Sequence, residues 1–462
     1  MSLKSLWAQM RGIPLPVYQP LWQMPIIDGQ SLAQGYNGTP EERAALNYIS
    51  RAGVKMLSGL QREDGANIGV HGSGMQDYNA TSSTGIVPAK VNGNAPACVT
   101  FALGVDLWRK ALDQPLNPMV VGFNGISGQS ILEFDDDSPT VTGSLGSLIR
   151  NKHSRWMTEV LSHTGAVDPM CYGMIQGEAN VSWTKQAYYD AAFAAYNDAL
   201  ADIEAATGIR PPLLLWQTGG YTDSQTFPYG STLAQLDLVR DTDGIFAGPL
   251  YPGLLADNNV HPDMESQLIW SEIGAYVLVQ HEMGRNLSIL PGTPTVNGNQ
   301  ISIPFEGLAP GKSLFFDPID KYAAYGGLSN HGCEVSGTTV TNVTLAGNTV
   351  TITAADPIAG RTVQIGMQSA DVSGFADGEG KNYGAHRCDI MESDPEQSLL
   401  VPGELLKRYI PSVRFEIEAE TQAGDPDQVL LWTASGYDGP ALTGNQPSTS
   451  GNVMSFDGSG LR

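Results

Sequence analysis

Apolar and polar positions alternate in two different ways along this chain, and the change falls near residue 290. Before that point, short apolar runs alternate with longer segments whose apolar positions recur at helical spacing. The short runs predict buried strands, and the longer periodic segments predict helices. Strands are expected at 24–28, 117–125, 169–180 and 211–220, and helices at 39–62, 98–112, 145–166, 184–208 and 264–284.

Strands that alternate with helices of this length predict a parallel sheet covered by helices on both faces. We therefore expect an α/β domain over residues 1–287. In such sheets the functional residues follow the carboxyl ends of the strands. Ser31 and Gly128 stand just past the end of a predicted strand, and Gln176, Glu178 and Gln217 stand at the carboxyl ends of theirs, where the apolar run gives way to polar residues.

Beyond residue 290 the pattern becomes one of short strands. β-branched residues alternate with polar ones at 293–307, 337–357 and 360–369, and Asn-Gly and Gly-Asn pairs stand between the runs. This pattern predicts antiparallel hairpins and a β-sandwich. We expect a β-sandwich accessory domain at 288–395, followed by a β-rich segment at 396–462 that is either a separate unit or part of the second domain.

Composition and charge exclude some functions. The formal net charge is −23, so the polyanionic backbone of nucleic acid would repel the chain. No apolar run reaches the roughly 18 residues that a membrane-spanning helix needs. The N-terminal stretch lacks the pattern of a signal peptide. The expectation is a chain without nucleic-acid or membrane partners, either cytoplasmic or associated with a virion, with the oligomeric state left open, a homo-oligomer included.

Cysteines and histidines give no sign of a metal or cofactor. The four cysteines form no CxxC pair, so we expect buried free thiols. His281-Glu282 is not followed by the second histidine of a zinc protease motif. No glycine-rich phosphate loop appears between a strand and a helix. We therefore expect no cofactor.

Four stretches carry residues suited to ester hydrolysis. They are 28–35 with Ser31, 122–131 with Gly128, 174–180 with Gln176, and 254–270 with His261. A serine hydroxyl needs a base to become a good nucleophile, and an imidazole can supply it. The first three stretches follow predicted strands, and the fourth precedes a predicted helix.

In this order the stretches resemble the SGNH or GDSL hydrolase superfamily, and within it the sialate O-acetylesterase-like carbohydrate esterases. The resemblance covers roughly residues 20 to 285 and rests on Gly29-Gln30-Ser31, Gln176-Gly177-Glu178 and His261-Pro262. It implies a three-layer flavodoxin-like hydrolase domain. It also implies that Ser31 is the nucleophile and that His261 is the base.

The resemblance further implies an oxyanion hole. Its donors would be the backbone N–H groups of Ser31 and Gly128 and one side-chain amide. The first choice for that amide is Gln176, and the second is Asn180. Such donors are typically worth about 3 kcal/mol each. Glu178 would brace the loop by hydrogen bonds rather than act on the substrate.

One position departs from the superfamily pattern, which has an aspartate three residues before the histidine. Here that position is Asn258, and an aspartate stands one place earlier, at Asp257. Either Asp257 orients His261 from a loop with one extra residue, or Asn258 orients a neutral ring, or a serine–histidine dyad suffices. Asp257 is the first choice.

Structural alternatives compete with each functional one. Ser31 is also a favourable helix N-cap, and a lone histidine such as His261 is commonly a surface residue. Trp183, Trp216 and Tyr221 could stack on a sugar, although core packing is the usual fate of such side chains.

The sequence predicts a serine esterase that removes acetyl groups from a carbohydrate through an acyl-enzyme, either a bacterial enzyme or part of a phage tail. The alternatives are a non-catalytic carbohydrate-binding or virion structural module on the same fold, and a GDSL-type lipase or thioesterase.

Overall fold

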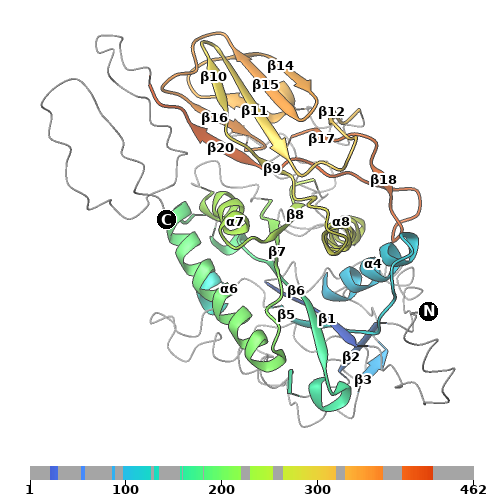
Figure 1. Ribbon diagram of the computed structural model, residues 1–462. Helices are drawn as coiled ribbons and strands as arrows, with labels where there is room; N and C mark the ends of the chain where they lie inside the picture. Colours follow the sequence, from blue (N-terminus) through green and yellow to red (C-terminus); the bar gives the residue numbers. More distant parts are fainter. Residues whose placement is uncertain are drawn as a thin grey trace, which may run out of the picture.

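The computed structural model describes residues 21–29, 54–57, 86–88, 97–125, 130–134, 157–158, 160–180, 182–219, 229–252, 264–318, 328–367 and 388–419. In these ranges an α/β region carries the parallel sheet, and antiparallel strands follow it (Figure 1). No helix in the described ranges is long and apolar enough to span a membrane.

Eight strands of the described chain form one sheet in the α/β region. They are β1 (Trp22–Gly29), β2 (Val54–Leu57), β3 (Ile86–Pro88), β4 (Met119–Val120), β5 (Gly122–Gly125), β6 (Val167–Ile175), β7 (Leu213–Gln217) and β8 (Ile245–Pro249). The central positions are parallel in the order β4/β5, β1, β6, β7, β8, with β4 and β5 both beside β1. In chain order this is 2-1-3-4-5, the flavodoxin-like arrangement. The predicted fold class is therefore confirmed.

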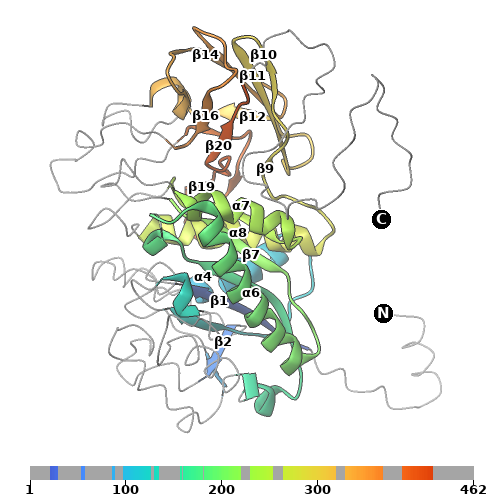
Figure 2. The same cartoon turned by 90° about the vertical axis from the view of Figure 1, so that its left-hand side faces the viewer.

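Helices cover both faces of this sheet. They are α4 (Ala97–Ala111), α6 (Lys185–Thr207), α7 (Gly230–Asp241) and α8 (Met264–Glu282). α4 and α8 pack together on one face, and α6 and α7 pack together on the other (Figures 1 and 2). The α4–α8 crossing is close because Gly104 has no side chain: a Cβ there would lie 2.9 Å from Cβ of Ala275.

Helix α6 agrees closely with its sequence signals. Thr184 caps its start, where the Thr184 hydroxyl accepts a hydrogen bond from the Ala187 N–H at 3.2 Å. Gly208 ends it in a left-handed conformation with φ of 75°, as is common after the last turn of a helix. The predicted strands at 117–125, 169–180 and 211–220 and the helices at 98–112 and 264–284 are confirmed in the same way.

Two sequence expectations differ from the structure. The helix expected over 39–62 is wrong at Val54–Leu57, which forms strand β2 and pairs with β4 and β3. Pairing on both sides of this four-residue segment outweighs its helical spacing. The sequence analysis also missed α7 and β8, the elements that precede the His261 stretch.

The C-terminal region consists of small antiparallel sheets. In β11 and β15, buried apolar residues alternate with less buried positions, as expected for a sheet with one covered face. One sheet contains β9 (Leu290–Pro291), β10 (Thr295–Asn297), β11 (Gln300–Glu306), β15 (Thr349–Ala354) and β14 (Val340–Ala346), and another contains β13 (Cys333–Val335), β16 (Thr362–Ile365) and β20 (Val413–Glu416). Two shorter pairs join β12 (Leu314–Phe316) to β17 (Ile390–Glu392) and β18 (Glu396–Gln397) to β19 (Leu405–Leu406).

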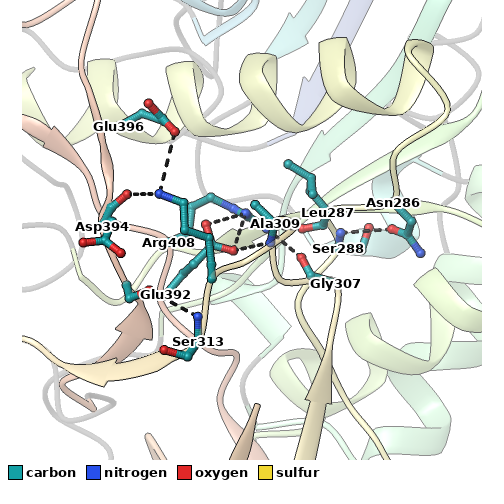
Figure 3. A network of polar contacts seen from close by, with 12 residues as sticks. Asn286, Leu287, Ser288, Gly307, Ala309, Ser313, Glu392, Asp394, Glu396 and Arg408 are labelled. Atoms are coloured by element: carbon teal, nitrogen blue, oxygen red, sulfur yellow. Dashed lines mark hydrogen bonds and ion pairs between the residues drawn. The ribbon is translucent and has the colours of Figure 1, made fainter. Parts of the chain in front are cut away.

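A buried ion pair fastens the C-terminal strands to the chain that leaves α8 (Figure 3). The Arg408 guanidinium donates to both carboxylate oxygens of Glu392 at 2.9 and 3.0 Å. It also donates to the backbone carbonyls of Leu287 and Gly307. The Ala309 N–H donates to Glu392 at 2.6 Å. Both charged groups are buried, and these partners offset the cost of taking them out of water.

Glu272 on α8 makes a second connection. Its carboxylate accepts hydrogen bonds from the Trp108 indole on α4 and from the backbone N–H groups of Leu399 and Leu400. It also accepts from the Ser398 hydroxyl. One buried carboxylate thus ties two helices to the loop between β18 and β19.

Candidate active site at the carboxyl edge of the sheet

The ends of three adjacent strands meet at one level of the sheet. Gly29, the last residue of β1, pairs with Gly125 at the end of β5. On its other side Gly29 pairs with Ile175, the last residue of β6. Because all three strands are parallel, the chain leaves each of them at the same edge. The first three motif stretches therefore begin in strands that end side by side.

The predicted site residues divide into two groups. Gln176, Glu178 and Asn180 lie in the described chain, directly after β6. Ser31, Gly128, His261, Asp257 and Asn258 lie outside the described residues, as does Tyr221. Ser31 follows the end of β1 by two positions, and Gly128 follows the end of β5 by three. Their roles stay predictions.

A network of buried amides joins the second and third stretches. The Gln176 side-chain amide donates to Oδ1 of Asn180 at 2.6 Å, and the backbone N–H of Ile131 donates to the same oxygen at 2.9 Å. These two donors identify that atom of Asn180 as the oxygen. The Asn180 amide nitrogen then donates to the Ser130 hydroxyl at 2.8 Å. This bond uses one of the two N–H groups of that amide.

Gly177 allows this turn to exist. Its φ is +145°, a conformation that side chains strongly disfavour. A Cβ at this position would lie 2.1 Å from the Thr218 hydroxyl oxygen. The preceding carbonyl, that of Gln176, accepts hydrogen bonds from Thr218 and from the Gln235 amide, the latter at 2.6 Å. The glycine of the Gln-Gly-Glu motif is thus required by close packing on β7 and α7.

Tyr188 on α6 completes the support. Its hydroxyl donates to the Gln176 side-chain oxygen at 2.8 Å. Burial raises the pKa of Tyr188 well above its ordinary value of 10.0, so the phenol remains a donor at neutral pH. Glu178 is buried at the start of the short helix Glu178–Asn180, and its bracing role stays a prediction. Sequence analysis missed Tyr188, Thr218 and Gln235, because no local pattern links residues so far apart.

A buried acid lies at the end of β1. Asp28 is fully buried and accepts a hydrogen bond from the Tyr172 hydroxyl on β6 at 3.2 Å. It precedes Ser31 by three positions. The only signal in the sequence was a carboxylate that ends an apolar run.

Residues at the end of β7 and just before α6 have structural partners. The Gln217 amide donates to the carbonyl of Ser412 at 2.9 Å and accepts from the Ser412 N–H at 2.7 Å. Trp216 is buried and packs edge-on against Phe101 at 6.0 Å between ring centroids. Trp183 is partly buried against the same core. For Trp216, core packing is therefore the role that the structure shows.

The four cysteines are free and buried, as predicted. Burial raises the pKa of Cys98 and Cys171, and that of Cys388 to about 12. None of these three is therefore an activated thiolate. Within the described ranges, no group of three or more His, Cys, Asp or Glu side chains is arranged to hold a metal ion.

Known proteins resemble the chain only distantly. No family model and no curated protein sequence matches it. A carbohydrate acetylesterase from Xanthomonas citri aligns with a TM-score of 0.48 and 15% identity, over 85% of this chain and 80% of that one. A tail fiber protein from an E. coli phage aligns with a TM-score of 0.31 and 10% identity, over 72% and 41%. A catalytic mutant of an acetylxylan esterase from Geobacillus stearothermophilus gives 0.25 and 11%, over 55% and 93%.

Proposed function

We propose that this chain is a serine esterase of the SGNH superfamily that hydrolyses acetyl esters of a carbohydrate. The observation that carries the proposal is that the parallel strands β1, β5 and β6 end side by side at the same edge of the sheet. The strands that precede the expected nucleophile and oxyanion donors all end at this edge of the sheet, which supports the proposal. If these strands had ended at separate places on the surface, the order of the motifs would be explained as a chance resemblance.

The reaction would proceed in two steps. The Ser31 oxygen attacks the acetyl carbonyl carbon while His261 takes the hydroxyl proton. The tetrahedral intermediate then releases the sugar as an alcohol, which receives that proton. Water, activated by the same imidazole, hydrolyses the acetyl-serine and regenerates Ser31. Asp257 would orient the imidazole and stabilise its charged form.

The braced third stretch suits oxyanion stabilisation. Donors help most when they are fixed before the charge develops, since no reorganisation is then needed. The Gln176 amide is held by Tyr188 and Asn180, and its turn is held by Thr218 and Gln235. We assign the side-chain donor to Gln176, with Asn180 as the positioning residue.

Hydrolysis of p-nitrophenyl acetate tests the proposal. We expect turnover by the native chain and a loss of at least about 1000-fold in kcat for Ser31→Ala, in the range that removal of a catalytic serine produces. Equal rates above background would favour the non-catalytic carbohydrate-binding module. Faster hydrolysis of octanoyl than of acetyl esters would favour the lipase or thioesterase alternative.

A further inference from the structure

We propose that a cavity between α8 and the C-terminal strands binds one neutral sugar ring of the substrate, at a distance from the ester. This inference rests on the proposed function. The α/β region lines the cavity with Tyr251 and Trp270, and the C-terminal region lines it with Asp317, Lys407 and Tyr409. The space open to the centres of water molecules is about 90 Å³. One water needs only about 10–15 Å³, so the cavity holds more than isolated waters.

The described lining residues include some on either side, in the sequence, of the stretch that carries His261. Tyr251 and Pro252 line it where the chain leaves β8, and Glu265 and Ser266 line it where α8 begins. β8 is three strand positions from β1. At about 4.8 Å per position, the lateral separation is about 14 Å. A ring bound here therefore belongs to a different part of the glycan from the acetyl group near β1.

Two donors at the cavity have hydrogen-bonding capacity to spare. The Trp270 side chain is 8% exposed, and no described residue accepts a hydrogen bond from its indole N–H. The Lys407 ammonium, with its three N–H groups, contacts within the described chain only the two carboxylate oxygens of Asp317, at 2.6 and 2.9 Å. A sugar hydroxyl could accept from either donor.

Aromatic rings supply the apolar surface that a ligand pocket needs. Tyr251 and Tyr409 contact edge to face at 6.2 Å between ring centroids. Their hydroxyls are already committed: Tyr251 donates to the carbonyl of Ile410, and Tyr409 donates to Asp317. The rings therefore act as fixed walls. Apolar walls with a few fixed polar groups are the usual composition of a small-molecule site.

The charge of the lining selects against anionic sugars. Among the described lining residues, four have carboxylates, Glu265, Asp317, Asp389 and Glu404, and two are cations, Lys407 and Arg408. The whole chain carries a net charge of −23. A sialic acid carboxylate would be repelled here, whereas a neutral ring would not. The inference thus points away from sialate and towards a neutral hexose or pentose polymer.

Calorimetric titration tests the site without requiring catalysis. The probes are xylohexaose, mannohexaose and cellohexaose, with sialyllactose as the anionic comparison, and the protein is the full chain with Ser31→Ala. We expect one neutral probe to bind. We expect Trp270→Phe to weaken it about fivefold, the net effect of one hydrogen bond. Leu405→Trp, which fills the cavity from a half-exposed position, should abolish binding.

Trp22→Phe is the matched control, since Trp22 begins β1 and therefore stands at the amino edge of the sheet. This variant should bind the neutral probe as tightly as the chain with Trp22 does. Failure of every neutral probe to bind, tighter binding of sialyllactose, or equal affinity in the Leu405→Trp chain would overturn the inference.

Kinetics separate this inference from the proposed function. With Ser31 present, Trp270→Phe should raise KM for an O-acetylated oligosaccharide of the bound sugar about fivefold more than KM for p-nitrophenyl acetate. A chain that binds the sugar but hydrolyses no acetyl ester contradicts the esterase and retains the sugar site. If the chain hydrolyses both substrates and Trp270→Phe changes both KM values by the same factor, the sugar site is contradicted and the esterase is retained.

Discussion

At the scale of single residues, the candidate site depends on Gln176, whose side chain and backbone are each held by separate hydrogen bonds. The Gln176 side chain is held through its oxygen by Tyr188 and through its nitrogen by Asn180. Its backbone carbonyl is held independently by Thr218 and Gln235. A side chain restrained at both ends retains little rotamer freedom, which is the property that an oxyanion donor requires.

Gly177→Ala should destabilise the protein and lower the rate of ester hydrolysis. The new Cβ would combine a disfavoured backbone conformation with a contact at 2.1 Å. Gly165→Ala is the matched control, because Gly165 has φ of +73° with nothing within 4 Å of the new carbon. Thermal unfolding should show a clearly larger decrease in melting temperature for Gly177→Ala than for Gly165→Ala. Equal losses of melting temperature would contradict a requirement for glycine at position 177 imposed by packing on Thr218.

Gln176→Met should lower kcat for p-nitrophenyl acetate about 100-fold or more, with a smaller change in KM. Methionine keeps the length of the side chain but removes the donor, and loss of one oxyanion donor typically has this effect. Gln186→Met changes an exposed amide on α6 and should leave kcat as it is. A native kcat in the Gln176→Met chain would remove Gln176 from the oxyanion hole.

At the scale of elements, the regular pieces of the fold could be predicted from the sequence. α6 has a capping threonine and a terminating glycine, and the hairpins have Asn-Gly and Gly-Asn turns. β2 could not be predicted, because Val54–Leu57 is a strand only through pairing with β3 and β4. For the site, the sequence singled out the motif residues Gln176, Glu178 and Asn180, whose roles stay predictions. Their supports come from distant elements and follow no local spacing.

Helix α8 contains an ionisable side chain, Glu272, whose effect on stability depends on pH. Burial raises the pKa of Glu272 above its ordinary value of 4.5, in spite of the hydrogen bonds that favour its charged form. The stability linked to its protonation is fully present below pH 4.5 and is lost as pH rises through the raised pKa.

Glu272→Gln should therefore change the pH dependence of unfolding. As pH rises from 4.5, the unfolding free energy of the native chain should fall relative to that of the variant. Urea titrations across this range measure the difference. Glu306→Gln, at an exposed position of β11, serves as the control. A difference between native and Glu272→Gln chains that is constant with pH would contradict this account.

At the scale of the whole molecule, the two regions share buried polar contacts. Arg408 with the Leu287 carbonyl, Glu272 with residues 398–400, and Gln217 with Ser412 all connect the α/β region or its exit to the C-terminal strands. Polar groups buried at such a boundary are costly unless paired. We expect the two regions to unfold together rather than as independent units.

Arg408→Met should lower the unfolding free energy by about 3–5 kcal/mol, since it leaves Glu392 buried without its cation. Adding Glu392→Met should recover part of that loss, because the uncompensated charge is then removed. Arg414→Met breaks an exposed ion pair with Glu416 and should have an effect below about 1 kcal/mol. A double variant whose loss equals or exceeds the sum of the single losses would contradict this explanation.

The central claim is that Ser31 is the nucleophile of an esterase at the carboxyl edge of the sheet. Treatment of the native chain with a fluorophosphonate, followed by mass spectrometry of its peptides, tests that claim most directly. The account predicts one covalent adduct, on Ser31, formed in parallel with loss of p-nitrophenyl acetate hydrolysis and much more slowly in His261→Ala. An adduct on another residue, or inactivation with Ser31 unmodified, would contradict it.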